Sequence, residues 1–87
     1  MNNKVLIKVY TPEYNKSYDI FIPVNELVWK VAKLMMKCIS DINNINSDLK
    51  KEYLLINQKT NEIYNNNVII RETDIRNGTE LVLIAKM

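Results

Sequence analysis

Alternating apolar and polar residues open the chain and predict two strands. The alternation runs over residues 4–10 and again over residues 17–22, with a short polar segment at 11–16 between the two runs. A period of two is the pattern of a strand that buries one face, and two such runs joined by a short turn form a hairpin. The residues predicted to share the buried face are Val5, Ile7, Val9, Tyr18, Ile20 and Ile22.

Helical spacing follows from residue 26 to residue 42, a segment without Gly or Pro. Pro23 should end the second strand, Asn25 is a favourable N-cap, and Glu26 suits the first turn of a helix. The predicted core face holds Val28, Val31, Ala32, Met35, Ile39 and Ile42. The predicted polar stripe holds Glu26, Lys30, Lys33, Lys37, Ser40 and Asp41. Flanking the core are Leu27 and Leu34 on one side, and Trp29 and Met36 on the other.

The remainder of the chain predicts short elements joined by turns. After a polar loop at 43–51, which we expect to be the loosest region, residues 53–56 form an apolar strand and residues 63–64 a brief one. A turn at 76–79 contains the only glycine, Gly78, where a positive φ is expected. A last strand follows over residues 80–85. Strands gathered around one long helix predict an α+β fold.

Composition excludes several classes of protein. A length of 87 residues predicts one domain over residues 1–87, and a net charge of +2 is too small to require a polyanionic partner. One cysteine and no histidine exclude a disulfide framework, a four-ligand zinc site and Ser–His or Cys–His catalysis. No apolar run reaches the roughly 18–20 residues that span a bilayer, and no signal peptide is visible. We expect a cytoplasmic protein without catalytic residues, metal or cofactor.

The order of apolar positions resembles the β-grasp fold of ubiquitin-like proteins over nearly the whole chain. The most specific spacing is that of Ile70, Ile75, Leu81 and Leu83 around the turn that contains Gly78. This resemblance implies a mixed sheet of four or five strands packed on one long helix.

Within ubiquitin-like proteins, the chain is similar to the small bacterial YukD/EsaB proteins. The similarity rests on size, on the helix opening at residues 23–28 and on the closing sequence D-I-R-N-G-T-E-L at residues 74–81. It implies a non-catalytic accessory or regulatory protein of type VII (WXG100, ESAT-6-like) secretion systems of Firmicutes. The partner would be membrane-anchored secretion machinery, with no small-molecule substrate. The abundance of Asn, Ile and Lys suggests an AT-rich bacterial genome.

The end of the sequence argues against conjugation. Ubiquitin, its conjugated relatives and the related sulfur carriers end in Gly-Gly, because a thin tail must enter the channel of an activating enzyme. Here the sequence ends Leu-Ile-Ala-Lys-Met, and Lys86 and Met87 are too bulky for that channel. We therefore expect an unconjugated protein, with a ubiquitin-like modifier or carrier as the alternative.

Six residues are candidates for partner binding. If Val5, Ile7 and Val9 face the helix, the opposite parity places other apolar side chains on the outer face of the sheet, which ubiquitin-like domains commonly use to bind partners. Two further residues, seven apart, stack on one edge of the helix, where they either extend the core or stay exposed as an anchor for another protein or a second copy. The candidates are Leu6, Tyr10, Phe21 and Leu54 on the sheet, and Trp29 and Met36 on the helix.

Other polar residues have simpler interpretations beside their functional ones. Lys30, Lys33 and Lys37 could bind nucleic acid, but such a surface would also have arginines and stacking aromatic residues interleaved with them. The arginines, Arg71 and Arg76, both lie elsewhere, so solvation is the preferred interpretation. Cys38 is expected to be a small buried hydrophobe. The carboxylates of Glu72 and Asp74 are expected to cap their own backbone.

Overall fold

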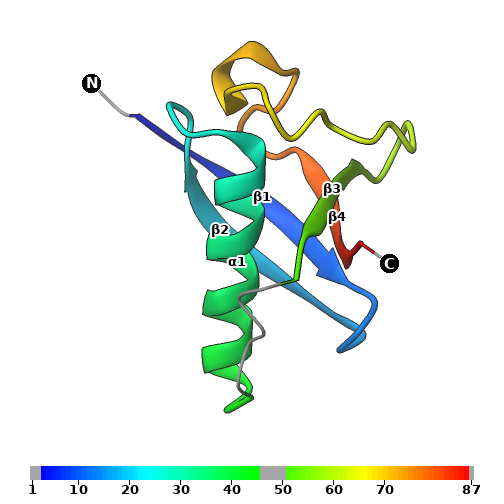
Figure 1. Cartoon of the computed structure of the whole chain (residues 1–87). Coiled ribbons are helices and arrows are strands. Elements are labelled where there is room, and N and C mark those ends of the chain that lie inside the picture. The colour runs from blue at the N-terminus through cyan, green and yellow to red at the C-terminus, as the bar shows by residue number, and fades with distance from the viewer. Residues whose placement is uncertain (1–2, 46–50, 87) are drawn as a thin grey trace.

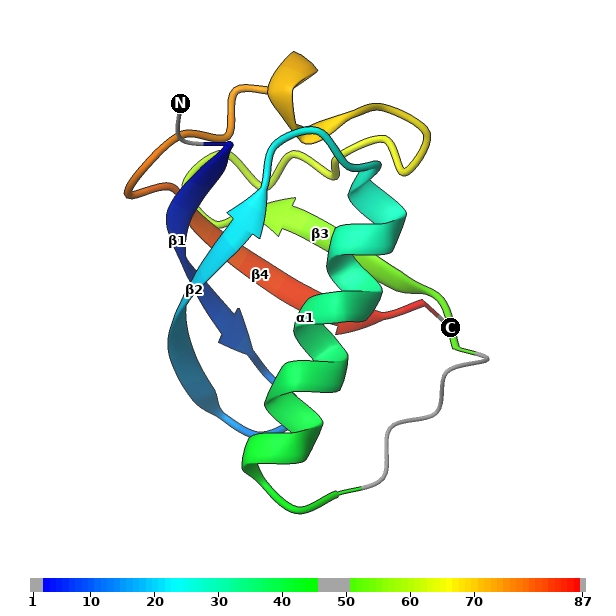
Figure 2. The ribbon, with the colours of Figure 1, turned by 90° about the vertical axis from the view of Figure 1, so that its left-hand side faces the viewer.

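One helix packs across a mixed four-stranded sheet. The computed structural model describes residues 3–45 and 51–86. The elements are β1 (Lys4–Thr11), β2 (Lys16–Pro23), α1 (Val28–Ile42), β3 (Tyr53–Asn57), the 3₁₀ turn η1 (Ile70–Glu72) and β4 (Glu80–Ala85). The strand order is β2-β1-β4-β3, with β1 and β4 parallel and the other neighbours antiparallel. The helix lies across one face of this sheet (Figures 1 and 2). This is the ubiquitin-like β-grasp arrangement that the sequence predicted.

The predicted first hairpin is present. β1 and β2 pair along their whole length, from Lys4 opposite Pro23 to Thr11 opposite Lys16. Asn15 takes a φ of 52° in the connecting turn, and its Oδ1 accepts a 2.8 Å hydrogen bond from the Tyr10 hydroxyl. Asn tolerates this left-handed backbone because its short side chain bonds locally.

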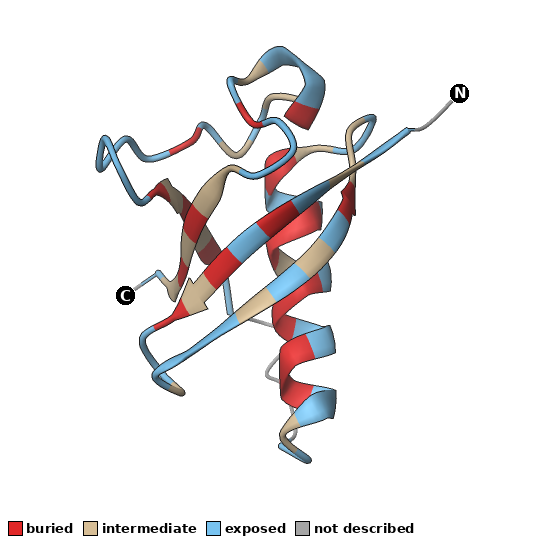
Figure 3. Ribbon diagram, turned by 180° about the vertical axis from the view of Figure 1, so that it is seen from behind, coloured by how far each residue is buried: buried red, intermediate tan, exposed pale blue. Residues whose placement is uncertain are grey.

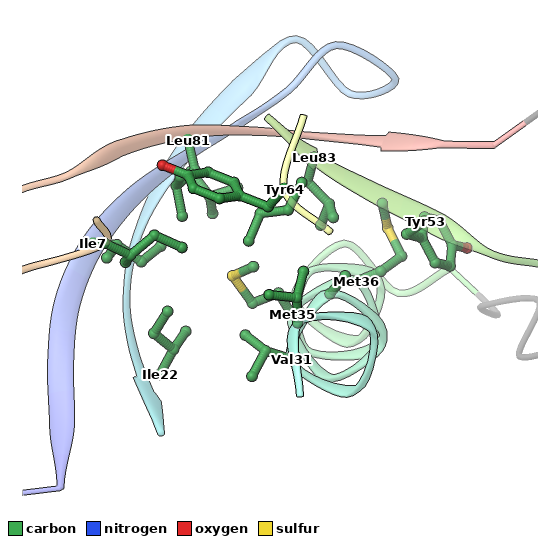
Figure 4. Close-up of a cluster of buried hydrophobic side chains, with 14 of the residues drawn as sticks. Ile7, Ile22, Val31, Met35, Met36, Tyr53, Tyr64, Leu81 and Leu83 are labelled. Carbon is green, nitrogen blue, oxygen red and sulfur yellow. The ribbon is translucent and has the colours of Figure 1, made fainter. Parts of the chain in front are cut away.

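The core lies between α1 and the concave face of the sheet (Figure 4). The alternating residues Ile7, Val9 and Ile22 are buried there, as predicted, and Leu81 and Leu83 of β4 lie at the centre. Each large apolar side chain buried in this way contributes roughly 1.5–3 kcal/mol. The other fully buried core residues are Val28, Val31, Ala32, Met35, Ile39, Leu55, Ile70 and Ile75.

The helix begins two residues later than predicted. Its N-cap is Leu27, whose side chain makes no capping hydrogen bond, so the expected cap at Asn25 is wrong. The first N–H groups are satisfied instead by main-chain carbonyls of a distant loop: Val28 N donates to Val68 O at 2.9 Å, and Trp29 N to Asn66 O at 3.3 Å. These main-chain carbonyls accept hydrogen bonds that a capping side chain would otherwise accept.

Four side chains of the helix have environments that differ from a predicted one, because the helix is turned about its axis relative to the prediction. Met36 is only 2% exposed and lies beside Tyr53 of β3 in Figure 4. Of its two predicted roles, extension of the core is therefore confirmed and that of an exposed anchor is wrong. Ser40, expected on the polar stripe, is buried. Cys38, expected to be buried, is exposed, and Ile42 is 63% exposed. The helix leans its buried face toward β3, which turns the side that carries Cys38 and Ile42 into solvent.

The return segment after β3 covers that strand. Instead of a fourth strand at 63–64, a single β-bridge joins Ile63 to Ile56. Gly78 has the expected positive φ, 86°, in the turn before β4. Of the polar loop predicted at 43–51, residues 46–50 lie outside the described residues, as does the predicted chain end at Met87.

Candidate protein-interaction surface

The outer face of the sheet, opposite α1, carries two separate apolar groups. Figure 3 shows exposed residues alternating with buried or intermediate ones along β1 and β2. Cross-strand neighbours on this face follow from the register: Leu6 lies opposite Phe21, and Tyr10 lies beside Val82. Such directly opposed side chains contact one another. The first group is Leu6 and Phe21, called here the Leu6–Phe21 pair. The second is the central strip of Tyr10, Leu54, Ile56, Val82 and Ile84.

The Leu6–Phe21 pair is the more exposed group. Phe21 is 60% exposed and Leu6 39%. The pair lines a shallow cavity of about 430 Å³ together with the turn that contains Asn77 and Gly78. That turn is fixed to β1, because Leu6 N donates to Asn77 Oδ1 and Gly78 N donates to Leu6 O, both at 2.8 Å. A hollow that has large apolar side chains beside charged walls suits an anchor residue of a protein partner.

A charged row separates the two apolar groups. Lys8 is the register partner of Asp19 on β2 and of Glu80 on β4, so one cation lies between two carboxylates. The central strip beyond this row is half-buried: Ile56 and Leu54 on β3 neighbour Val82 and Ile84 on β4. The face therefore offers an exposed pair, a row of charges and a flatter strip, which a partner could contact with apolar groups on either side of polar ones.

The structure places the helix candidates away from this face. Trp29 is 37% exposed and lines a separate cavity of about 460 Å³ with Lys33, Tyr53 and Lys86 among its walls. Because Trp29 belongs to α1, which lies on the inner face of the sheet, it is separated by the sheet from the Leu6–Phe21 pair on the outer face. Of the six predicted residues, the four on the sheet share one face, Trp29 stands apart, and Met36 belongs to the core.

Several residues of the outer face were missed by sequence reasoning. Val82 and Ile84 could have been found, because Leu81 and Leu83 were predicted to share the opposite face of the same strand. Asn77 and Gly78 could not, since only the parallel pairing of β1 with β4 brings their turn beside Leu6.

The lysine stripe is engaged within the helix itself. Lys37 Nζ lies 3.7 Å from Asp41 Oδ2, one turn further along. The ammonium groups of Lys30 and Lys33 lie 5.6 and 5.7 Å from the centre of the Trp29 ring, within cation–π range. These contacts give the lysines local roles that need no phosphate. Within residues 3–45 and 51–86, no three His, Cys, Asp or Glu side chains gather to form a metal site.

A buried hydroxyl network fixes the segment that covers β3. The Tyr64 hydroxyl donates a 2.6 Å hydrogen bond to Asp74 Oδ1 and accepts one of 2.9 Å from Asn57 Nδ2. Asp74 thus holds a tyrosine, where it was expected to cap its own backbone. Burial and the adjacent Asp74 carboxylate raise the pKa of Tyr64 to about 12. The network is structural, because the tyrosine is kept neutral at ordinary pH.

Comparisons with known proteins identify the fold. No protein family and no curated protein matches the sequence. Among solved structures, the chain is similar to a component of the MycP5-free ESX-5 inner membrane complex, with a TM-score of 0.78, 12% identity and coverage of 98% of this chain. It spans only 21% of that component. The EccD5 ubiquitin-like domain from Mycobacterium xenopi matches with a TM-score of 0.75, 9% identity and coverage of 98% of this chain and 97% of that domain.

The fold is also similar to that of a chain from an enzyme complex. A chain of a toluene 4-monooxygenase complex matches with a TM-score of 0.75, 8% identity and coverage of 95% of this chain and 99% of that one. At such low identities the likeness establishes the fold, which is ubiquitin-like, and leaves the function to be argued from the surface. Among the described residues, no helix is both long and apolar enough to cross a membrane.

Proposed function

We propose that this chain is a non-catalytic protein-interaction module of the YukD/EsaB kind, an accessory component of a bacterial type VII secretion system. The 87 residues would act as one cytoplasmic unit that docks on membrane-anchored secretion machinery. Two structural neighbours support this assignment, since one belongs to the ESX-5 inner membrane complex and the other is the EccD5 ubiquitin-like domain.

The observation that carries the proposal is the Leu6–Phe21 pair on the uncovered sheet face. Two large apolar side chains stand opposite each other on adjacent strands, beside a hollow that a rigid turn completes. Their exposure contributes nothing to the core, which lies on the other side of the sheet. Burial of both against a partner would supply the central contact of an interface.

Export of a WXG100 substrate by the source bacterium tests both the type VII assignment and the docking surface. Deletion of the gene should abolish export of the WXG100 substrate, and a chain carrying Leu6→Asp and Phe21→Asp should fail to restore it. The matched control is Ile63→Asp, because Ile63 is also exposed, at 58%, but lies beside the outer edge of β3. This control should restore export, and the double variant should keep its thermal transition, since both residues are exposed.

Two results would contradict the proposal in different ways. Normal export after deletion would remove the type VII assignment. Normal export with the double variant, where deletion abolishes it, would leave the assignment in place and exclude the outer face as the docking surface. The absence of conjugation is a separate prediction: mass spectrometry of cell lysate should find no adduct of higher mass.

A further inference from the structure

Main-chain groups along the outer edge of β2 have no hydrogen-bond partner among the described residues. Leu6 N, Leu6 O and Lys8 N are bonded on the β4 side of β1, so the alternation of an antiparallel ladder turns Val5, Ile7 and Val9 toward β2. Their register partners on β2 are its even-numbered residues. The odd-numbered residues therefore direct N–H and C=O outward. We call this the β2 free edge, formed by Ser17, Asp19 and Phe21.

No other described segment bonds to this edge. Within residues 3–45 and 51–86, no hydrogen bond from outside β1 reaches the main chain of Ser17, Asp19 or Phe21. Three residues with one donor and one acceptor each form a row that matches the spacing of another extended chain. Only an extended main chain can satisfy the whole row.

An apolar row of the helix runs beside the same edge. Leu34, Cys38 and Ile42 are spaced four residues apart, so they share one side of α1, and all three are exposed. The side is that of Val31, which with Leu34 and Pro23 lines a cavity of about 380 Å³ between the helix and the end of β2. The cavity is lined by Leu34 from the row and by Pro23 from β2, and the space between the row and the β2 free edge is called the groove below.

At the end of the groove near Lys16, side-chain hydrogen bonds join β2 to the end of the helix. Asn43 Nδ2, just past the helix, donates to the Tyr18 hydroxyl at 2.8 Å, and Lys16 Nζ donates to Asn43 Oδ1 at 3.1 Å. At the other end Pro23 has no N–H to offer. At roughly 3.3 Å per residue, the strand from Lys16 to Pro23 matches an extended segment of about seven residues.

We propose that the β2 free edge binds an extended peptide segment of another protein as a fifth strand. Side chains on one side of that strand would contact Leu34 and Cys38, so alternate residues should be apolar. Those on the other side would lie in line with Ser17, Asp19 and Phe21, where a basic residue opposite Asp19 complements its charge. The site is distinct from the docking surface proposed above, and either can fail without the other.

A second copy of this chain fits the edge less well. Antiparallel pairing of two β2 strands that uses all three outward residues is centred on Asp19, which places two carboxylates directly opposite each other. Like charges in that position are destabilising. Shifting the pairing by two residues toward the strand end brings in Pro23, which has no N–H.

The probe is an acetylated and amidated peptide, Ser-Thr-Ile-Lys-Val-Thr-Ser, titrated into the isotope-labelled protein by NMR. Its Lys is placed opposite Asp19, and its Ile and Val face the helix. We expect saturable shifts of the Ser17, Asp19 and Phe21 amides together with those of residues 34–38. Saturating peptide should also slow alkylation of Cys38, the only cysteine of the chain.

The matched control peptide carries an N-methyl group on the Lys. It has the same side chains and lacks only the central N–H, so its affinity should fall about tenfold or more. On the protein, Leu34→Lys should weaken binding while leaving the spectrum folded, because Leu34 is 48% exposed.

Three outcomes would overturn the proposal. They are absence of shifts at the β2 free edge at millimolar peptide, equal binding of the N-methylated peptide, and an edge already occupied by self-association. The last would appear as concentration-dependent shifts of Ser17, Asp19 and Phe21 without peptide, and would assign the edge to a second copy.

Discussion

The two edges of the sheet are treated differently by the same chain. At β3 the segment after the strand folds back: Asn57 N donates to Glu62 O and Tyr64 N to Leu55 O, both at 2.9 Å, and the Tyr64 side chain is buried. At β2 no described residue takes the place of that segment. One edge is paired and covered, whereas the other is a bare row of main-chain groups beside an apolar helix side.

This difference separates a structural edge from an available one. A covered edge contributes to stability, because its hydrogen bonds and the apolar side chain over them are buried. A bare edge contributes little and is a template for pairing, which proteins commonly block with charges or proline. Here Asp19 lies in the middle of the edge and Pro23 at its end, so self-pairing is hindered while a complementary strand is not.

The largest difference should come from truncating one aromatic residue at each edge. Tyr64→Ala should lower the free energy of unfolding by about 3–5 kcal/mol, because it opens a cavity over β3 and removes the hydroxyl network. Phe21→Ala should cost less than about 1 kcal/mol, since its ring is mostly in solvent. Denaturant titration of both variants measures this. Equal losses would mean that the β2 edge is as structural as the β3 edge.

Amide exchange should separate the edges without mutation. Ser17, Asp19 and Phe21 should exchange on the order of a hundredfold faster than Asn57 and Tyr64, since exposed amides need no opening while buried ones do. Tyr18 and Ile20, bonded to β1, serve as internal controls because they lie in the same strand. Hydrogen–deuterium exchange followed by NMR gives the rates. Slow exchange of the three odd-numbered amides would show that the edge has a partner.

Alkaline pH should loosen the covered edge alone. Burial and the Asp74 carboxylate raise the pKa of Tyr64 from its ordinary 10.0 to about 12, so the folded state disfavours the tyrosinate. The stabilisation is complete below pH 10 and is lost as pH rises from 10 to 12, at most about 2–3 kcal/mol. Unfolding measured across this range should show that loss in the wild type. The Tyr64→Phe variant keeps every lysine and lacks only the hydroxyl, so it should not show this loss of stability. An equal loss of stability in the variant would assign the effect to other titrating groups.

The smallest change in stability is expected from the exposed ion pair on the helix. Lys37 and Asp41 form an exposed ion pair, so Lys37→Ala should change stability by less than about 0.5 kcal/mol. The same variant should leave binding of the heptapeptide unchanged, because the row that lines the groove is Leu34, Cys38 and Ile42. Thermal unfolding and the NMR titration check the two statements. A marked loss of peptide affinity would extend the groove to the lysine stripe.

Part of the surface could be predicted from the sequence alone. Strict alternation at Leu6 and Phe21 was enough to place both on the outer face, because the side-chain period of a strand is two whatever its neighbours are. The helix candidates fared differently. A side chain on the flank of a helix, such as Met36 or Cys38, is buried or exposed according to which strand the helix leans on, and periodicity does not contain that information.

By itself the sequence determined the fold class, the first hairpin and its buried face, the turn at Gly78 and the core spacing of Ile70, Ile75, Leu81 and Leu83. These follow from local geometry, in which period and turn chemistry leave few choices. Tertiary structure alone decided where the helix begins, since carbonyls of residues 66 and 68 satisfy its first N–H groups. It also decided which sheet edge is covered, because strand order and the path of residues 62–64 depend on contacts between segments far apart along the chain.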